Sequence, residues 1–140
     1  MSLKQRGQRA ETALRDILQA RGYPCIRSAA SKCLDVVCLR PRAPGYGFEC
    51  KSVHNSGRLD LRRHDVEQWE ELKRLRDDGH LVLYAVWWGS TQRWEFFHPH
   101  DGPILHMGRG TDELRFLPAV FPLQPSYKVP TEGTTDGSRP

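Results

Sequence analysis

The sequence predicts an α/β fold in which a mixed β-sheet is flanked by helices. Three observations predict it: two stretches with helical spacing of apolar residues, a Pro/Gly-rich turn between two strand-like stretches, and a continuous apolar run of strand length at 81–88. In chain order these give a helix, three strands, a second helix and two strands. The 140 residues are enough for one domain with a single core.

The first helix is expected between residues 4 and 21, where the apolar residues have helical spacing and Gly22 follows the last turn. Glu11 precedes Leu14 by three residues and Leu18 by seven, so it lies on the stripe that faces the protein. A carboxylate at this place needs a partner. The plain interpretation is a glutamate that interacts favourably with the helix dipole.

A short strand is expected at 23–28, followed by a loop of small residues that ends at Lys32. Small residues allow a ligand to approach the backbone closely. Arg27, Ser31 and Lys32 could therefore contact a phosphate, the serine by a hydrogen bond and the two cations by charge. An ordinary polar loop is the alternative interpretation.

The next two strands, at 33–39 and 48–53, form a hairpin with charged groups inside it. Glu49 and Lys51 are two residues apart and project from the same face. If the turn is centred near Arg42, Asp35 lies opposite Glu49, within about 5 Å at the side-chain root. Two carboxylates in a half-buried strand pair require compensation, which a hard divalent cation usually provides. An exposed hairpin with solvated charges is the alternative.

A basic segment, 52–63, follows the hairpin and suits a loop along a DNA backbone. A second helix is expected from about Val66 to near Gly79, and strands at 81–88 and 92–98. Gln68 of this helix is taken as solvent-facing, with a position near the site as the alternative. The tryptophans exceed what so small a core is expected to hold. Some of them are therefore predicted to lie at a subunit interface, and the candidates are Trp69 together with Trp87, Trp88 or Trp94.

Composition divides the chain into a folded part, 1–99, and a Pro-rich extension, 100–140, which is expected to be partly disordered because seven of the ten prolines fall from Pro99 onward. Residues 1–98 hold 17 lysines and arginines against 12 acidic residues, whereas 99–140 hold 4 against 5. This basic excess fits a polyanionic partner. The four cysteines lack zinc-site spacing and are expected to be reduced thiols.

No apolar run approaches about 18 residues, and no charged stretch followed by an apolar one begins the chain. Neither a membrane span nor a secretory signal is predicted. We therefore expect a protein of the cytoplasm, or of the host cytoplasm if a virus encodes it.

Asp35, thirteen intervening residues and Glu49-Cys50-Lys51 resemble the signature of the PD-(D/E)xK nuclease superfamily, with Leu34 in place of its proline. Four stretches also resemble, in order, the archaeal-type Holliday junction resolvases: 6–11, 22–32, 34–37 and 48–51. The resemblance covers roughly residues 4–99 and implies a restriction-endonuclease-like fold. It also implies a metal-dependent endonuclease that cuts four-way DNA junctions as a homodimer.

The resemblance further implies Mg²⁺ as the cofactor, replaceable by Mn²⁺. Its ligands would be Asp35, Glu49, the backbone carbonyl of Cys50 and Glu11, directly or through water. Lys51 would orient or deprotonate the attacking water. Ser31 is the remaining candidate catalytic residue, and the candidate DNA-binding residues are Arg9, Arg27, Lys32, Arg58, Arg62 and Arg63.

Two other functions stay open at this point. One is a different nuclease of the same superfamily, with a restriction, replication or repair role. The other is a DNA-binding module with a vestigial site, which the joint presence of Glu11, Asp35, Glu49 and Lys51 disfavours.

Overall fold

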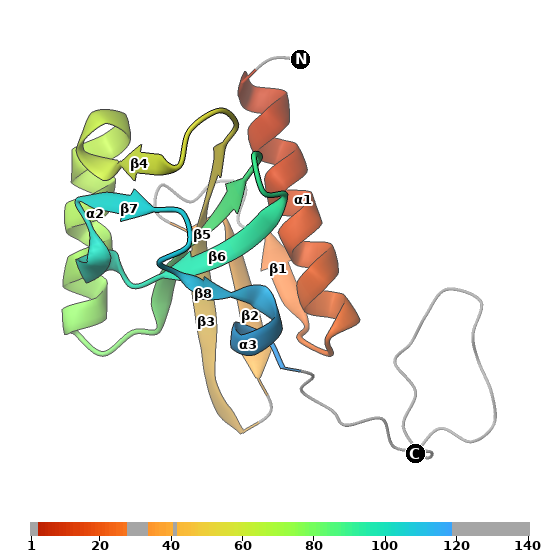
Figure 1. The fold of residues 1–140 in the computed structure, drawn as a ribbon. Helices are drawn as coiled ribbons and strands as arrows, with labels where there is room; N and C mark the ends of the chain where they lie inside the picture. Colours follow the sequence, from red (N-terminus) through yellow and green to blue (C-terminus); the bar gives the residue numbers. More distant parts are fainter. Residues whose placement is uncertain (1–2, 28–33, 41, 119–140) are drawn as a thin grey trace.

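The computed structural model describes residues 3–27, 34–40 and 42–118 (Figure 1). Its elements, in chain order, are α1 (Leu3–Ala20), β1 (Cys25–Arg27), β2 (Val36–Arg40), β3 (Ala43–Val53), β4 (Arg58–Asp60), α2 (Leu61–Asp77), β5 (Val82–Trp88), β6 (Arg93–Phe97), the short 3-10 helix η1 (Pro99–Asp101), β7 (Ile104–His106), β8 (Thr111–Asp112) and α3 (Glu113–Phe116). The predicted order of the first helix, three strands, second helix and two strands is confirmed, with β4 inserted before α2.

The main sheet has six strands in the order β1-β2-β3-β5-β6-β8. The central pair β3 and β5 is parallel, because α2 carries the chain back across the sheet between them, and the other neighbours are antiparallel. Strands β4 and β7 form a separate two-stranded sheet. The mixed sheet predicted from the sequence is thus confirmed.

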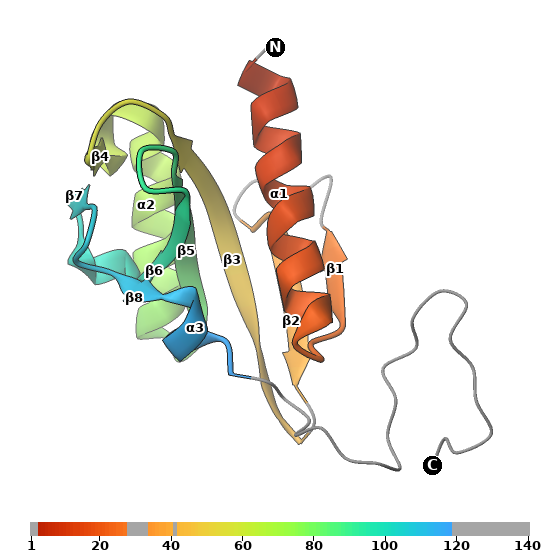
Figure 2. The same ribbon diagram turned by 45° about the vertical axis from the view of Figure 1, so that its right-hand side comes forward.

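The two long helices cover opposite faces of the sheet (Figure 2). Leu14 and Leu18 of α1 pack with Phe48 and its neighbours in one core cluster, the α1-side core. Leu72 of α2 packs with Tyr84 and its neighbours in another, the α2-side core. Because β3 and β5 lie between the helices, their alternate side chains contribute to both layers.

Local sequence sets where α2 begins and ends. The Asp60 side chain accepts a hydrogen bond from the Arg62 backbone N–H and caps the helix N-terminus. At the other end, Gly79 adopts a φ of 98°, a conformation that glycine reaches without steric cost. A break in the helical backbone at Asp65 separates the first turn from the rest.

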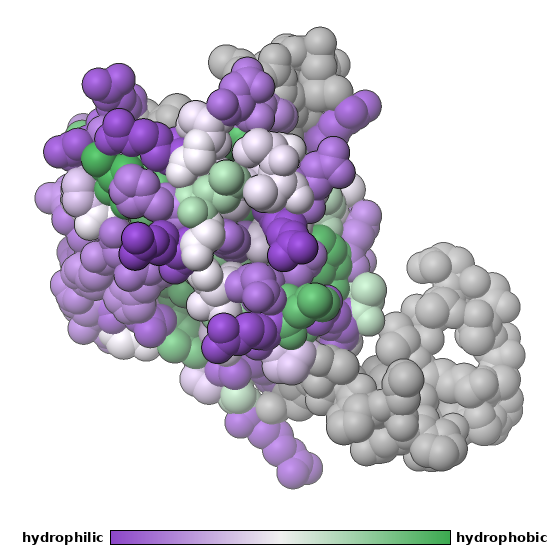
Figure 3. Space-filling model, in the orientation of Figure 1, coloured by the Kyte–Doolittle hydropathy of each residue, from purple (hydrophilic) through white to green (hydrophobic). Residues whose placement is uncertain are grey.

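Two of the four candidate tryptophans are buried inside the protein and not at a subunit interface. Trp88 is 0% exposed and Trp94 is 2% exposed, so both belong to the protein's own cores. A sheet covered on both faces has two buried layers rather than one, and the aromatic residues fill them. Trp69 and Trp87 are half-buried. On the face drawn in Figure 3, hydrophobic residues form small separate spots within a mostly hydrophilic surface.

The packed part of the chain continues beyond residue 99. Strand β7 supplies Leu105 to the α2-side core, and Leu117, directly after α3, belongs to the α1-side core. Residues 119–140, which make up most of the expected extension, lie outside the described residues. Within the described part of the chain, no helix has the length and apolar character needed to cross a membrane.

Candidate active site

The hairpin of β2 and β3 brings Asp35 and Glu49 together in the predicted register. Val36 pairs with Phe48, and the Asp35 backbone N–H donates to the Phe48 carbonyl at 2.8 Å. Asp35 therefore lies beside this part of β3, where its carboxylate interacts with that of Glu49. The turn passes through Arg42, whose φ is 57°, at the position expected for its centre.

A second hydrogen bond orients the Asp35 side chain. Its Oδ2 accepts from the Cys50 backbone N–H at 2.9 Å. In an extended strand the N–H and C=O of one residue leave on the same side. The Cys50 carbonyl is therefore directed to the edge of β3 where the Asp35 carboxylate lies, so two kinds of oxygen donor meet there.

Glu49 is a buried carboxyl with one oxygen that forms no hydrogen bond. Its residue is 5% exposed, and Oε1 is buried without a hydrogen-bond partner. The other oxygen, Oε2, lies 3.7 Å from Lys51 Nζ. Burial, followed by repulsion from the Asp35 carboxylate, raises the pKa of Glu49 to about 9, while Lys51 and the Gln68 side chain oppose this shift. The single ammonium group of Lys51 therefore does not neutralise the charges of both Asp35 and Glu49.

These donors fit a hard divalent cation, which binds carboxylate and carbonyl oxygens. The buried, unpartnered Oε1 of Glu49 is the observation that favours such an occupant, because buried polar atoms in proteins are nearly always paired. Across the described ranges, no group of three His, Cys, Asp or Glu side chains is arranged to hold a metal. The oxygen donors that the structure places together here are those of Asp35 and Glu49 and the Cys50 carbonyl.

Glu11 approaches this region from α1 but does not form a three-carboxylate group with Asp35 and Glu49. It acts on the Cys50 thiol, whose pKa is raised well above its ordinary value by burial first, and then by the carboxylates of Asp35, Glu49 and Glu11. Glu11 is half-buried, in agreement with the prediction that it faces the protein.

Three of the candidate DNA-binding arginines surround β4 and the start of α2. Arg62 pairs with Asp60 at 2.9 Å, and Arg63 lies 3.9 Å from the same carboxylate. The Arg62 hydrogen bond is the main cause that lowers the pKa of Asp60 to about 2. Arg58 and Arg63 line a groove of about 390 Å³. Arg9 is exposed on α1.

The remaining candidates fall outside the described residues. These are Ser31 and Lys32, together with the side chain of Arg27. The described cysteines, Cys25, Cys38 and Cys50, are free thiols as expected.

A family model for the archaeal Holliday junction resolvase (Hjc) matches residues 2–108. The chain belongs to the Hjc family. It is a crossover junction endonuclease, and the nucleases of this family are metal-dependent. This membership decides between the functions left open by the sequence in favour of junction cleavage.

Solved structures agree with the Hjc assignment. The Archaeoglobus fulgidus Hjc, a Holliday junction resolvase from an archaeal hyperthermophile, is 26% identical and aligns over 68% of this chain and 74% of its own, with a TM-score of 0.55. The bacterial homing endonuclease I-Ssp6803I aligns over 84% of this chain and 93% of its own. It is 13% identical, and its TM-score of 0.53 shows a shared fold. No curated protein matches the chain.

Two further residues of this Hjc-family chain lie near Glu49. Gln68 was taken as solvent-facing, with a position near the site as the alternative, and it is half-buried with its side chain acting on Glu49. Tyr84 of β5 is the register partner of Glu49 and is 0% exposed. In the sequence, the only sign that Gln68 could be near the site is its position directly before the inward-facing Trp69. Tyr84 could not be placed beside Glu49 from the sequence, because their pairing depends on the parallel contact of β3 with β5.

Proposed function

We propose that this chain cuts four-way junctions at a site formed by Asp35, Glu49 and Lys51, with Mg²⁺ as the metal and Mn²⁺ as a substitute. The observation that carries the proposal is the buried, unpartnered Oε1 of Glu49 beside Asp35. The two carboxylates and the Cys50 carbonyl would hold the cation, and Glu11 would contribute directly or through a water. We also propose that the part of the chain that carries this site folds as a single nuclease domain.

The chain's own groups have distinct tasks in this mechanism. The Cys50 N–H holds the Asp35 carboxylate in one orientation, so a ligand oxygen is in place before substrate binds. Lys51, with a side chain 19% exposed, can meet the attacking water and offset the charge that develops on the phosphate. When bound, a divalent cation supplies charge neutralisation at the phosphate and an acidified water.

Arginines at two places would position the DNA backbone around this site. Arg58, Arg62 and Arg63 lie around β4 and the start of α2, and Arg9 lies on α1. Guanidinium groups bind phosphate oxygens by charge and paired hydrogen bonds. Arg27, Ser31 and Lys32 are proposed to contact the phosphate beside the metal, as the family resemblance implies.

The decisive test of the site separates cutting from binding. Asp35→Asn and Glu49→Gln should each abolish Mg²⁺-dependent cleavage of a four-way junction, because each removes a ligand charge. Junction binding in EDTA should stay near wild type, since the basic surface is kept. Glu67→Gln, an exposed glutamate of α2, is the matched control and should cut normally. Cleavage retained by both site variants would contradict the assignment.

Substrate choice is measured with four-way, three-way, flap and linear duplex DNA of matched sequence. All reactions are compared at equal salt, because phosphate contacts make affinity strongly dependent on ionic strength. The proposal expects the four-way junction to be cut fastest. Equal cutting of the linear duplex would contradict junction selectivity.

We propose a homodimer as the active assembly, because two opposing strands must be nicked and each chain supplies one site. Wild-type chains should linearise a supercoiled cruciform plasmid. Mixed assemblies of wild-type and Asp35→Asn chains should nick one strand and yield open circles. A wild-type protein that sediments as a monomer with junction bound would overturn the dimer.

A further inference from the structure

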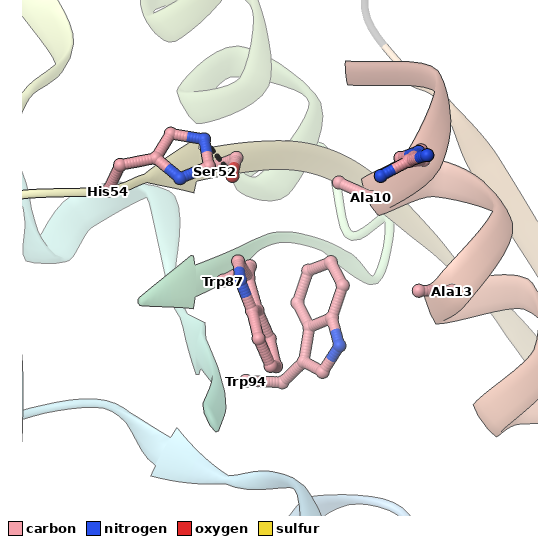
Figure 4. A pocket seen from close by; sticks show the side chains of 7 residues that line it. Ala10, Ala13, Ser52, His54, Trp87 and Trp94 are labelled. Carbon is pink, nitrogen blue, oxygen red and sulfur yellow. Dashed lines mark hydrogen bonds between the residues drawn. The ribbon is translucent and has the colours of Figure 1, made fainter. Parts of the chain in front are cut away.

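A cavity of about 430 Å³ lies between α1 and the ends of β3, β5 and β6 (Figure 4). Its volume falls within the range of about 300–1,000 Å³ typical of ligand sites. Two tryptophans, two alanines and three polar residues line it: Arg9, Ala10, Ala13, Ser52, His54, Trp87 and Trp94. None of these residues belongs to the proposed metal site.

The two indoles form an aromatic wall of this tryptophan pocket. The rings of Trp87 and Trp94 are 5.7 Å apart between centroids, with an interplanar angle of 56°. Trp94 is 2% exposed and packs against Trp87 from the α1-side core, whereas Trp87 is half-buried. On the α1 side, the pocket is lined by the small side chains of Ala10 and Ala13 beside Arg9 (Figure 4). A flat group can therefore lie against Trp87.

Polar groups stand at the other side of the tryptophan pocket. The Ser52 hydroxyl and the His54 ring nitrogen Nε2 are 3.4 Å apart (Figure 4). Arg9 adds a guanidinium group from α1. An aromatic wall combined with such groups suits a flat heterocycle that is attached to a phosphate.

The tryptophan pocket is continuous with the basic groove at β4. Ser52 and His54 line both cavities, and the groove adds Arg58 and Arg63. Arginines therefore lie at both ends of this continuous surface, Arg58 and Arg63 in the groove and Arg9 at the pocket. This continuity favours a nucleic acid as the occupant, because its backbone phosphates can contact the arginines while one base enters the pocket.

The pocket is also close to the proposed catalytic residues along the chain. Ser52 follows Lys51 directly on β3, and His54 is three residues, or about 10 Å, beyond Lys51. Side chains alternate, so Ser52 projects on the α1 side and Lys51 on the α2 side of the same strand. The pocket and Lys51 therefore lie on opposite faces near the same end of β3, so DNA that passes this end lies close to both.

We propose that the tryptophan pocket binds one unstacked nucleobase of the junction, which stacks on Trp87 while Arg9 contacts a neighbouring phosphate. Unstacking a base costs least where pairing is already disrupted, and the branch point offers bases at helix ends. This inference rests on the proposed junction cleavage. The stacked base would be a contact that the enzyme makes with a junction and not with a continuous duplex.

The test is a set of four-way junctions, each with a single abasic site at a different position near the branch. Dissociation constants are measured in EDTA at fixed salt with wild type, Trp87→Leu and Trp87→Phe. Removing the base that enters the pocket should weaken wild-type binding at least about fivefold, the lower end of base–aromatic stacking energies. Trp87→Leu should bind the intact junction equally weakly and be insensitive to that abasic site.

Two comparisons make the test specific. Trp87→Phe keeps an aromatic ring and should retain most of the sensitivity. Leu114→Ser, a change at an apolar residue that is 73% exposed on α3, should behave as wild type. Urea unfolding of each variant establishes that it is folded. If Trp87→Leu does not fold, the abasic series with wild type and Trp87→Phe still decides the matter.

Two results would overturn the inference and leave the proposed function intact. One is wild-type binding that no abasic position weakens by about fivefold, with normal preference for the four-way junction. The other is a shift of Trp87→Leu from dimer to monomer in sedimentation, which would assign the pocket to contact with a second copy. Loss of junction preference in wild type itself would instead contradict the proposed function.

Discussion

Replacing Glu49 by glutamine should stabilise the metal-free protein even though it removes catalysis. Glutamine has nearly the same shape but cannot carry the charge that burial and the Asp35 carboxylate disfavour. Because the pKa of Glu49 is raised in the folded state, wild type gains a proton on folding between the ordinary pKa of 4.5 and about 9. The contribution of Glu49 to stability is therefore fullest below pH 4.5 and falls as the pH rises toward 9.

The size of this effect follows from the pKa shift. At pH 7 the solution is about 2.5 pH units above the ordinary pKa of 4.5, and each unit corresponds to about 1.36 kcal/mol. Protonating Glu49 on folding therefore costs about 3 kcal/mol at pH 7 and less than about 1 kcal/mol at pH 5. The free energy of unfolding of Glu49→Gln should therefore exceed that of wild type by a larger margin at pH 7 than at pH 5.

The assay is urea unfolding in EDTA at pH 5 and pH 7 for wild type, Glu49→Gln and the exposed control Glu67→Gln. The control should follow wild type. Adding Mg²⁺ at pH 7 should stabilise wild type and have a smaller effect on Glu49→Gln, because a ligand that binds only the folded state raises its stability. If wild type and Glu49→Gln show the same change from pH 5 to pH 7, Glu49 is not the buried carboxyl described above.

Three further predictions concern the surface and the core. Glu95→Ala should lower the free energy of unfolding by about 3 kcal/mol, measured in urea, because the buried carboxylate accepts from two backbone N–H groups and the Trp88 indole; an unchanged midpoint would contradict this. Arg58→Gln and Arg63→Gln should each reduce the salt dependence of junction affinity by about 0.9 in log–log slope, and an unchanged slope would remove that residue from the DNA contacts. Gly45→Ala should destabilise the hairpin by about 1–3 kcal/mol in thermal or urea unfolding, since the added Cβ would lie 2.3 Å from a backbone carbonyl of β2; wild-type stability would show that the strand can shift.

The sequence alone determined the hairpin and the placement of its charges. Side-chain alternation in a strand has a period of two, so the sequence separation of Glu49 and Lys51 already decides that they share a face. A turn centred at Arg42 then fixes Asp35 opposite Glu49, and the observed pairing of Val36 with Phe48 has this register. These are local properties, and local backbone geometry suffices to predict them.

The helices and their inward faces were determined in the same way. The spacing of Leu14 and Leu18 in α1 and of Trp69 and Leu72 in α2 identified the sides that pack on the sheet. The motif around Asp35 and Glu49 likewise indicated the nuclease family that the family match shows.

Only the tertiary structure decided which groups surround Glu49. Its neighbour Tyr84 is brought there by the parallel pairing of β3 with β5, and Gln68 by the packing of α2 on that pair. The burial of Trp88 and Trp94 was decided by the same sandwich of helices around the sheet. Contacts between residues distant in the chain depend on the summed packing of whole elements, and no local pattern in the sequence carries that information.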